Sequence, residues 1–479
     1  MTWQHHILTW LAPEKTGLKI VTDRTGVLSG SGFTRFLTEE GVTFLAVEDE
    51  SSLLRIHQQH FKGLVISKVE PPYFIARKTP NKTFAHENLP LNGERHLLKT
   101  LTDDELSCLL DYCYQTDPHI VISPHNLPEL LEKSKRIGKE KQLEADYQLL
   151  EELLQSTPEP DVALQAGKLW GTIQFQSWQL GDESYQDWLP KLDNFSERFI
   201  STGGMEQAIV ASTHFQPRTV DRILGNIKSE QPEKLALVCF DCMGMVEWEL
   251  LKNWLTSFQE TFEETALFAL LPTVTAISRS AIFSGSRDVY NLKNPGRATE
   301  PSAFANFFPQ NSTRYFTYKE EISDDSLLGY DAVALLYTFF DDLAHSAQFP
   351  SGTVSKRLYF NSVLNWLDHS SVKSDLKTLL RNGFSLYFCS DHGSTVATGN
   401  GQKLVRYIQE TFAKRGCLIA AENQELTAYR RFPVPFQGGK VIVIPEGRQM
   451  FGNQGVIEIN HGGISLDEMV VPFIKVKPT

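Results

Sequence analysis

Residues 235–241, LALVCFD, indicate the fold of the second half of this chain. Six apolar residues in a row followed by an aspartate are typical of a strand buried on both faces of a parallel sheet. The amphipathic segment WELLKNWLTSFQ (248–259) and a second apolar run, ALFALLP (266–272), come next. This strand–helix–strand order predicts an α/β domain over residues 233–479, with a central sheet flanked by helices.

Further apolar runs continue the pattern toward the C-terminus. The run over 440–459 has two apolar segments joined by a Gly-containing connection, which is typical of a β-hairpin. The runs are DAVALLYTFFDDLAH (331–345), FSLYFCSDHGS (384–394), KVIVIPEGRQMFGNQGVIEI (440–459) and NHGGISLDEMVVPFI (460–474).

Residues 1–130 alternate short apolar runs with helical patterns, which predicts a small N-terminal α/β domain with a parallel sheet. A response-regulator receiver would need an aspartate at the end of its third strand, and that place reads Ser67-Lys68 here, which excludes a receiver. The apolar runs are LKIVTD (18–23), VTFLAVED (42–49), GLVISKVE (63–70) and HIVISP (119–124).

Residues 131–232 read as a helical domain that links the two α/β parts. The polar, Pro-containing stretch SEQPEK (229–234) marks its end. Apolar side chains recur beneath a charged face at the three- and four-residue spacing of a helix. They are Leu143, Tyr147, Leu150 and Leu154.

Composition limits the possible partners. The formal net charge of -12 argues against broad binding of duplex nucleic acid, which needs a basic surface. The basic residues from Lys133 to Lys141 are interleaved with glutamates, which favours a solvated helix face over a nucleic-acid patch. Six scattered cysteines suit free thiols in a reducing compartment. No signal peptide and no apolar run of ~20 residues is visible, so we expect a cytoplasmic protein without a membrane span.

Polar residues that could carry chemistry follow the predicted strands or lie in Gly-rich turns. Carboxylates and imidazoles together fit two adjacent divalent metal ions, with zinc as the usual choice for mixed oxygen and nitrogen ligands and manganese as an alternative. A hydroxyl at a strand-to-helix junction would face the positive end of the helix dipole. The candidate residues are Asp241, Thr275, Asp341, His345, Asp391, His392 and His461.

Several alternatives remain open within these segments. Thr273 could replace Thr275 as a nucleophile, and Asp342, three residues before His345, could replace Asp341 as a ligand. Arg279, one helical turn past Thr275, could hold a substrate phosphate or could pair with a carboxylate such as Asp288. The Cys239/Cys242 pair has no second pair to complete a zinc site, so both read as buried thiols.

The amino-acid sequences of these motifs resemble those of the PglZ domains of BREX phage-defence systems, which belong to the alkaline phosphatase superfamily. The resemblance covers roughly residues 235–479, and it implies an alkaline-phosphatase-like fold for that part. The similar segments are T-x-T-A-I-S-R-S, D-x-x-x-H after an apolar L-L-Y run, S-D-H-G-S, and N-H-G-G-I-S followed by E-M-V-V-P.

The resemblance also implies roles for single residues. One metal would be held by Asp341, His345 and His461. The second would be held by Asp241, Asp391 and His392, with Thr275 as the nucleophile in its coordination sphere. The P-T-x-T junction and the D-x-x-x-H spacing of the family favour Thr275 over Thr273 and Asp341 over Asp342.

Two departures from the family pattern concern substrate contacts rather than metals: Cys242 stands where relatives have Gly or Ala, and Gly244 stands where they have an Arg. By resemblance we expect a metal-dependent phosphodiesterase of nucleotides or single-stranded oligonucleotides, acting with other subunits in anti-phage defence. The alternative is a metal-binding scaffold subunit with little or no catalysis.

Overall fold

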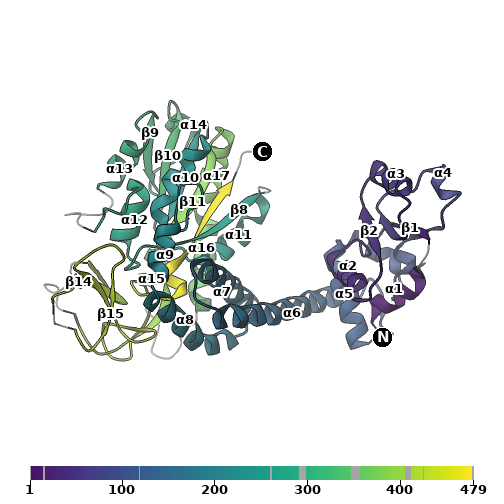
Figure 1. The fold of residues 1–479 in the computed structure, drawn as a ribbon, viewed down its shortest axis with the longest axis horizontal. Helices are drawn as coiled ribbons and strands as arrows, with labels where there is room; N and C mark the ends of the chain where they lie inside the picture. The colour runs from purple at the N-terminus through teal and green to yellow at the C-terminus, as the bar shows by residue number, and fades with distance from the viewer. Residues whose placement is uncertain are drawn as a thin grey trace. The chain divides into compact units, whose positions relative to one another are not determined.

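The protein is described by a computed structural model that covers residues 2–13, 17–117, 119–258, 261–290, 298–346, 356–404, 411–423 and 426–476. The chain forms two compact units, Met1–Glu144 and Ala145–Thr479 (Figure 1). In the described part of the chain, no helix has both the length and the apolar character needed to cross a membrane.

The first unit is built on a four-stranded parallel sheet with the order β2-β3-β1-β4. The predicted run over 119–124 forms only the short strand β6 (Val121–Ile122), which pairs with β5 (Asn92–Gly93) outside this sheet. The fourth strand of the sheet is instead β4, a polar edge strand of which only Phe84 is buried. The sheet strands are β1 (Leu18–Asp23), β2 (Phe44–Val47), β3 (Gly63–Ser67) and β4 (Asn81–Phe84).

Helices cover this small sheet and bury two apolar clusters, one that includes Trp3, Leu64 and Phe84 and a smaller one that includes Leu53 and Val65. Three of the helices begin with side-chain caps, from Thr2, Asp49 and Thr102, which satisfy free backbone N–H groups of the first turn. The main helices are α1 (Trp3–Leu11), α2 (Ser31–Glu39), α3 (Glu50–Gln58) and α5 (Asp103–Thr116).

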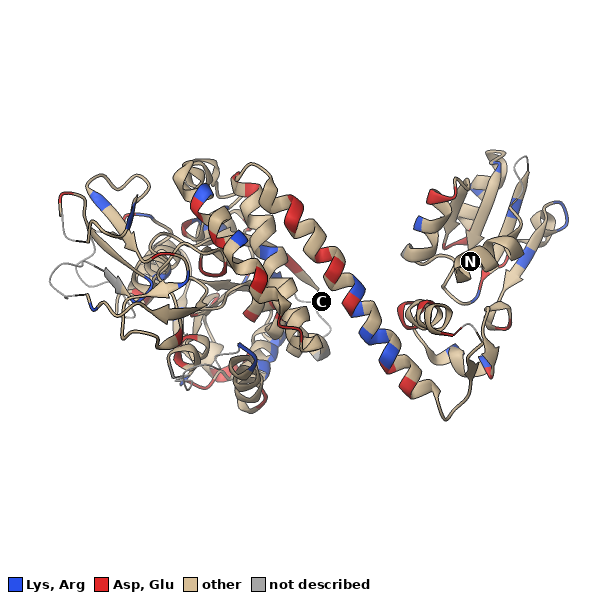
Figure 2. Ribbon diagram, turned by 90° about the horizontal axis from the view of Figure 1, so that it is seen from below, with Lys and Arg blue, Asp and Glu red and all other residues tan. Residues whose placement is uncertain are grey.

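Helix α6 (Leu127–Gln155) runs from the first unit into the second. Blue and red residues both occur along it in Figure 2, as the interleaved charges of the sequence predict. Three of its basic side chains pair with carboxylates at 2.6–3.0 Å: Lys133 with Glu129, Lys135 with Glu105 and Arg136 with Glu140.

The second unit contains a six-stranded sheet with the order β8-β19-β11-β7-β10-β9. The stretch 235–240 is its strand β7, buried along its whole length and parallel to both neighbours, as predicted. Strand β19 is antiparallel to β11 and β8. The strands are β7 (Leu235–Phe240), β8 (Phe262–Phe268), β9 (Thr313–Thr317), β10 (Ala332–Tyr337), β11 (Ser385–Ser390) and β19 (Val470–Val476).

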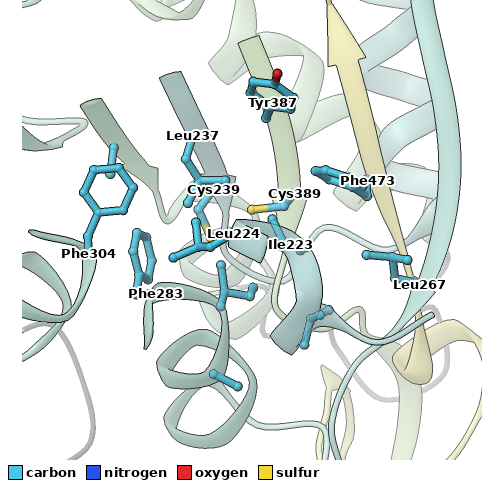
Figure 3. Close-up of a cluster of buried hydrophobic side chains, with 14 of the residues drawn as sticks. Ile223, Leu224, Leu237, Cys239, Leu267, Phe283, Phe304, Tyr387, Cys389 and Phe473 are labelled. Atoms are coloured by element: carbon cyan, nitrogen blue, oxygen red, sulfur yellow. The ribbon is translucent and has the colours of Figure 1, made fainter. Parts of the chain in front are cut away.

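Helices pack on both faces of this sheet. On one face, side chains of α10 (Ile223–Glu230), α12 (Thr275–Ser284) and α13 (Glu300–Phe307) bury the main apolar cluster around Leu237 and Cys239 (Figure 3). On the other face, Trp248 packs against Phe388. The helices of that face include α11 (Met245–Trp254), α16 (Lys356–His369) and α17 (Val372–Arg381).

Helix α7 (Pro160–Leu180) packs closely against helix α11 and strand β19. A Cβ atom on Gly167 would lie 2.6 Å from Val470, and one on Gly171 would lie 2.5 Å from Met245. Helices α8 (Leu189–Ser201) and α9 (Gly204–Ala211) lie in the same unit. Most of the segment 131–232 is therefore part of the unit that contains the large sheet, and the three-domain division stays a prediction.

Residues 395–460, which we call the inserted segment, form two small sheets. The prediction of a hairpin over 440–459 is wrong. Strand β16 (Lys440–Ile444) pairs with β14 (Gly416–Ala420) and β15 (Arg430–Pro433). Strand β18 (Ile457–Asn460) pairs with β12 (Thr395–Gly399). Both strands find partners outside the run, which local periodicity cannot show. The remaining strands are β13 (Thr411–Ala413) and β17 (Gln449–Met450).

Candidate metal centre

Three neighbouring parallel strands of the large sheet end at one place, and an acidic residue follows each. Asp241 comes directly after β7 and Asp391 directly after β11. Strand β10 leads into helix α15 (Phe339–Ser346), whose first turn carries Asp341. The carboxyl ends of parallel strands form the usual binding crevice of such sheets, so this edge is the expected place for a site.

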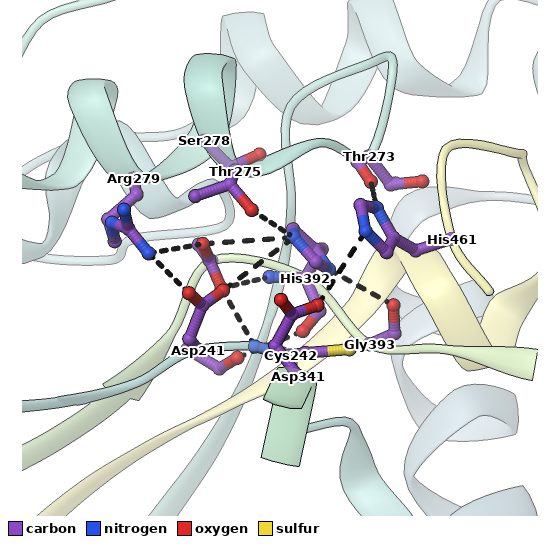
Figure 4. A network of polar contacts seen from close by, with 12 residues as sticks. Asp241, Cys242, Thr273, Thr275, Ser278, Arg279, Asp341, His392, Gly393 and His461 are labelled. Carbon is purple, nitrogen blue, oxygen red and sulfur yellow. Dashed lines mark hydrogen bonds and ion pairs between the residues drawn. The ribbon is translucent and has the colours of Figure 1, made fainter. Parts of the chain in front are cut away.

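Asp241, Asp391 and His392 form the first ligand group, in which each offers an atom within 4.8 Å of the others. His392 Nε2 lies 3.8 Å from Asp391 Oδ2 and 4.0 Å from Asp241 Oδ1. All three side chains are buried, and Figure 4 shows Asp241 and His392 side by side. The backbone N–H of Cys242 donates to Asp391 Oδ1 at 3.1 Å, which orients the carboxylate and leaves Oδ2 for another partner.

Asp341, His345 and His461 form the second ligand group, within the same distance limit. Asp341 Oδ1 lies 3.2 Å from His345 Nε2 and 3.7 Å from His461 Nε2. Asp341 and His345 share one helix face, as their four-residue spacing predicts. The neighbouring Asp342 is exposed and accepts a hydrogen bond from Thr338, so it is not part of the group.

The two groups adjoin each other through their histidines. The rings of His392 and His461 stack with centroids 4.2 Å apart. His392 Nδ1 donates to Gly393 O at 3.2 Å and His461 Nδ1 donates to Thr273 O at 3.1 Å. With Nδ1 protonated, each Nε2 keeps its lone pair, and this backbone support is the usual arrangement for metal-binding histidines.

Three carboxylate oxygens at the centre are buried and have no hydrogen-bond partner among the described residues. A buried, unpaired carboxylate oxygen is costly unless a cation or a donor satisfies it. These atoms are Asp241 Oδ1, Asp341 Oδ1 and Asp391 Oδ2. Together with the free Nε2 atoms they fit divalent cations well.

Burial shapes the protonation of the metal-free centre. It raises the pKa of Asp391 and, with the Asp391 charge, that of Asp241. It lowers the pKa of His392 and, with the His392 charge, brings that of His461 to about 4. Burial would raise the pKa of Asp341 too, but the imidazoles of its group hold it below its usual range. The buried imidazoles are therefore neutral ligands at pH 7.

Thr275 is the first residue of α12, and its hydroxyl points into the centre. Its Oγ1 lies 3.0 Å from His392 Nε2. Thr273, the alternative nucleophile, is fully buried, and its hydroxyl donates to Gly463 O at 2.9 Å and accepts from Gly462 N at 3.2 Å. The Thr273 hydroxyl thus holds the glycine turn that carries His461, whereas the Thr275 hydroxyl faces the ligand groups.

Arg279 is buried one turn further along α12 and is held by carboxylates. Its Nη1 donates to Asp241 Oδ2, and its Nε donates to Glu300 Oε1 at 2.8 Å. Tyr315 donates to the second oxygen of Glu300 at 2.6 Å. The structure thus pairs Arg279 with carboxylates other than Asp288. Sequence reasoning missed Glu300, because its link to Arg279 spans 21 positions and no local motif marks it.

Backbone geometry brings the first ligand group together. A Cβ atom on Gly393 would lie 2.0 Å from Asp467 O, so only glycine fits at this place. Cys242 has a φ of 65°, in the left-handed region that favours glycine. This conformation directs its N–H to Asp391, and it accounts for the expectation of Gly at this position.

Comparisons with solved structures find similar folds at low sequence identity. Murine ectonucleotide pyrophosphatase/phosphodiesterase 5 is 14% identical, with a TM-score of 0.32, over 50% of this chain and 87% of that one. An inactive form of the murine protein in complex with AMP matches similarly, at 14% identity and a TM-score of 0.32 over 51% and 88%. Phosphonoacetate hydrolase from Sinorhizobium meliloti 1021, in complex with phosphonoformate, is 13% identical with a TM-score of 0.31 over 51% and 90%. No curated protein matches the chain.

The family model described as the BREX system PglZ alkaline phosphatase-like domain matches residues 219–476. This match spans more than half of the 479 residues. It confirms the predicted resemblance and the predicted α/β fold with an alkaline-phosphatase-like C-terminal part. The chain therefore belongs to the PglZ family of BREX systems, whose domain is alkaline phosphatase-like.

Proposed function

We propose that this protein is a metal-dependent phosphoesterase that uses Thr275 as its nucleophile. One observation carries the proposal: the Thr275 hydroxyl faces two adjoining ligand groups whose buried carboxylate oxygens have no hydrogen-bond partner among the described residues. Membership of an alkaline phosphatase-like family supports a phosphoesterase-type function. The full donor set favours catalysis over a purely structural role.

We assign one divalent ion to Asp341, His345 and His461, and the other to Asp241, Asp391, His392 and Thr275. Mixed oxygen and nitrogen donors favour zinc, with manganese as the second choice. When bound, such ions would lower the pKa of a coordinated hydroxyl and neutralise charge on the phosphate oxygens.

The chain itself supplies the nucleophile and its orientation. Thr275 Oγ1 forms a bond to phosphorus as the bond from phosphorus to the leaving alcohol breaks. A water molecule then displaces Thr275 from phosphorus and restores the hydroxyl. The position of Thr275 at the start of α12 favours negative charge on its oxygen, because free N–H groups and the positive end of the helix dipole lie there.

Arg279 acts as a positioning residue in this scheme. Its side chain donates hydrogen bonds to the carboxylates of Asp241 and Glu300, and it is only 3% exposed. It therefore holds Asp241 in place and balances buried negative charge.

We further propose that the substrates are diesters, such as nucleotides or short single-stranded oligonucleotides, and that the protein works in the cytoplasm with other phage-defence subunits. A diester carries one negative charge, so it needs less cationic support than a monoester dianion. The overall charge of -12 speaks against tracking along a duplex.

A kinetic comparison tests this function. The purified chain, loaded with zinc or with manganese, is assayed on bis-p-nitrophenyl phosphate, p-nitrophenyl phosphate and a supercoiled plasmid. We expect the diester to be hydrolysed fastest and the plasmid to stay intact. Preference for the monoester would overturn the substrate class, and full metal loading without hydrolysis of any ester would instead support the scaffold alternative.

A further inference from the structure

The inserted segment separates His392 from His461 along the chain, and one of its turns returns to the metal centre. Residues 414 and 415 form the turn between β13 and β14. The backbone N–H of Arg415 donates to His461 O at 3.2 Å. A Cβ atom on Gly416 would lie 2.3 Å from Gly462 O, so the turn and the glycine loop of His461 are in close contact.

Arg415 anchors this turn and cannot serve a substrate. It is 3% exposed, and its Nη2 and Nε lie 2.9 and 3.2 Å from the carboxylate of Glu468. Its Nη1 donates to Gly447 O and Gln449 O at 2.9 and 3.0 Å. Glu468 also accepts from Gly463 N at 2.8 Å. One carboxylate therefore fixes both the turn and the loop that carries His461.

Lys414, the other residue of the turn, has its side chain 40% exposed. Its Nζ contacts Glu458 on β18, three residues before His461. Helix α15, which carries Asp341 and His345, packs against β18. Lys414 thus contacts the strand against which the helix of Asp341 and His345 packs, and the side chain of His345 is 44% exposed.

The charges of the metal centre are compatible with a further cation, such as the Lys414 ammonium group, that contacts an anionic substrate. Three carboxylates would offset most of the charge of two divalent ions, and Arg279 donates to Asp241 and Glu300. An ammonium group has three donors, so contact with Glu458 leaves two for an anionic ligand.

We propose that Lys414 binds a second phosphate of the substrate, next to the phosphate that is cleaved. This inference rests on the proposed phosphodiesterase function and narrows its substrates to those with an adjacent phosphate, such as oligonucleotides. Lys414 acts as a specificity-determining residue at the rim of the site, because its charge is exposed on the side of the second ligand group.

The test compares two substrates in the metal-loaded full chain. Bis-p-nitrophenyl phosphate has no second phosphate, whereas an oligothymidylate has several. Lys414→Met should raise KM for the oligothymidylate about fivefold, the range of one rim ion pair, and leave bis-p-nitrophenyl phosphate hydrolysis unchanged. Lys414→Arg should keep the wild-type KM. Lys377→Met removes the same charge from an exposed position on α17 and should change neither substrate.

A binding measurement gives a readout without turnover. In the Thr275→Ala background, the Kd of a fluorescein-labelled oligothymidylate should rise about fivefold when Lys414 becomes Met. Equal effects on both substrates, or no effect on oligothymidylate, would overturn the role of Lys414. So would a return to the wild-type KM in the Lys414→Met/Glu458→Gln variant, because Lys414 would then only neutralise Glu458. A wild-type chain without activity on bis-p-nitrophenyl phosphate would overturn the phosphoesterase itself.

Discussion

Thr275 Oγ1 lies 3.0 Å from His392 Nε2, and these atoms come from the start of a helix and the end of a strand that are 117 positions apart in the sequence. His392 Nδ1 is fixed by the backbone carbonyl of Gly393, and its Nε2 faces the Thr275 hydroxyl. The contact places the proposed nucleophile beside the first ligand group. A hydroxyl and a neutral imidazole in this position can share one cation.

The first prediction separates the two threonines. Thr275→Ala should keep the fold and nearly all bound metal while hydrolysis of bis-p-nitrophenyl phosphate falls roughly a thousandfold or more, because only the attacking atom is removed. Thr273→Ala should instead lower the free energy of unfolding by about 1–2 kcal/mol, since its hydroxyl bridges Gly462 and Gly463. Kinetics and urea unfolding of both variants decide this, and an active Thr275→Ala enzyme would remove Thr275 as the nucleophile.

The second prediction concerns metal content. Asp341→Ala and Asp391→Ala should each lower the bound zinc from two ions per chain toward one, because each removes a buried oxygen from a different ligand group. Asp342→Ala is the matched control, since Asp342 is exposed and should leave the metal content unchanged. Mass spectrometry of metals in the purified variants measures this. Wild-type zinc content in the Asp341 variant, or its loss in the Asp342 variant, would contradict the assignment.

Much of this site could be predicted from the sequence because it follows simple local rules. Acidic residues after buried parallel strands meet at one sheet edge, which brings Asp241 and Asp391 together. A D-x-x-x-H spacing on a helix puts Asp341 and His345 on one face. The assignment of ligands to two metals came from the family resemblance and remains a proposal.

Features that depend on distant contacts could not be predicted. The partners of Arg279 are fixed by packing between α12 and α13, and the pairing of β16 and β18 by strands far away in the chain. The apolar pattern of HIVISP (119–124) predicted a strand of the N-terminal sheet, but the polar segment β4 forms the edge strand instead. An edge strand can join a sheet by backbone hydrogen bonds alone, so its side chains need not be apolar. The close packing of α7 depends on two glycines whose importance appears only with their neighbours.

The third prediction tests Arg279 as a positioning residue. Arg279→Met should lower the free energy of unfolding of the metal-free protein by about 3–5 kcal/mol, because it leaves the buried carboxylate of Glu300 without its charged partner and Asp241 without its hydrogen-bond donor. Arg314→Met removes an arginine whose side chain is 39% exposed and should cost less than about 1 kcal/mol. Denaturant unfolding measures both. Equal stability of the two variants would show that the buried pairs contribute little.

The fourth prediction uses two glycines as a matched pair. Gly393→Ala should destabilise the chain and weaken zinc binding, because its Cβ would meet Asp467 O at 2.0 Å and the strain would displace His392. Gly452 lies in the inserted segment, and a Cβ atom on it would meet no atom within 4 Å. The Gly452→Ala protein should therefore keep a stability and a zinc affinity near wild type. Thermal unfolding with and without zinc tests both variants. Wild-type zinc affinity of the Gly393→Ala protein would show that the close contact between Gly393 and Asp467 does not hold His392 in place.

The last prediction is the pH dependence of metal uptake. Burial raises the pKa of Asp391 and, with the Asp391 charge, brings that of Asp241 to about 8, so the Asp241 carboxyl retains its proton near neutral pH in the metal-free protein, whereas burial keeps His392 and His461 neutral. Since only the ionised carboxylate binds a cation, zinc displaces this proton, and its affinity should rise from about pH 6 to about pH 9.

Competition with a fluorescent chelator at several pH values measures the affinity, and an indicator dye in weak buffer measures the protons released. Asp241→Asn should release fewer protons and show a shallower pH dependence, because one of the raised carboxyls is gone. Zinc affinity that does not change with pH, or proton uptake on binding, would show that the buried carboxyls are already ionised. In that case Arg279, whose charge lowers the pKa of both carboxyls, would outweigh the effect of burial.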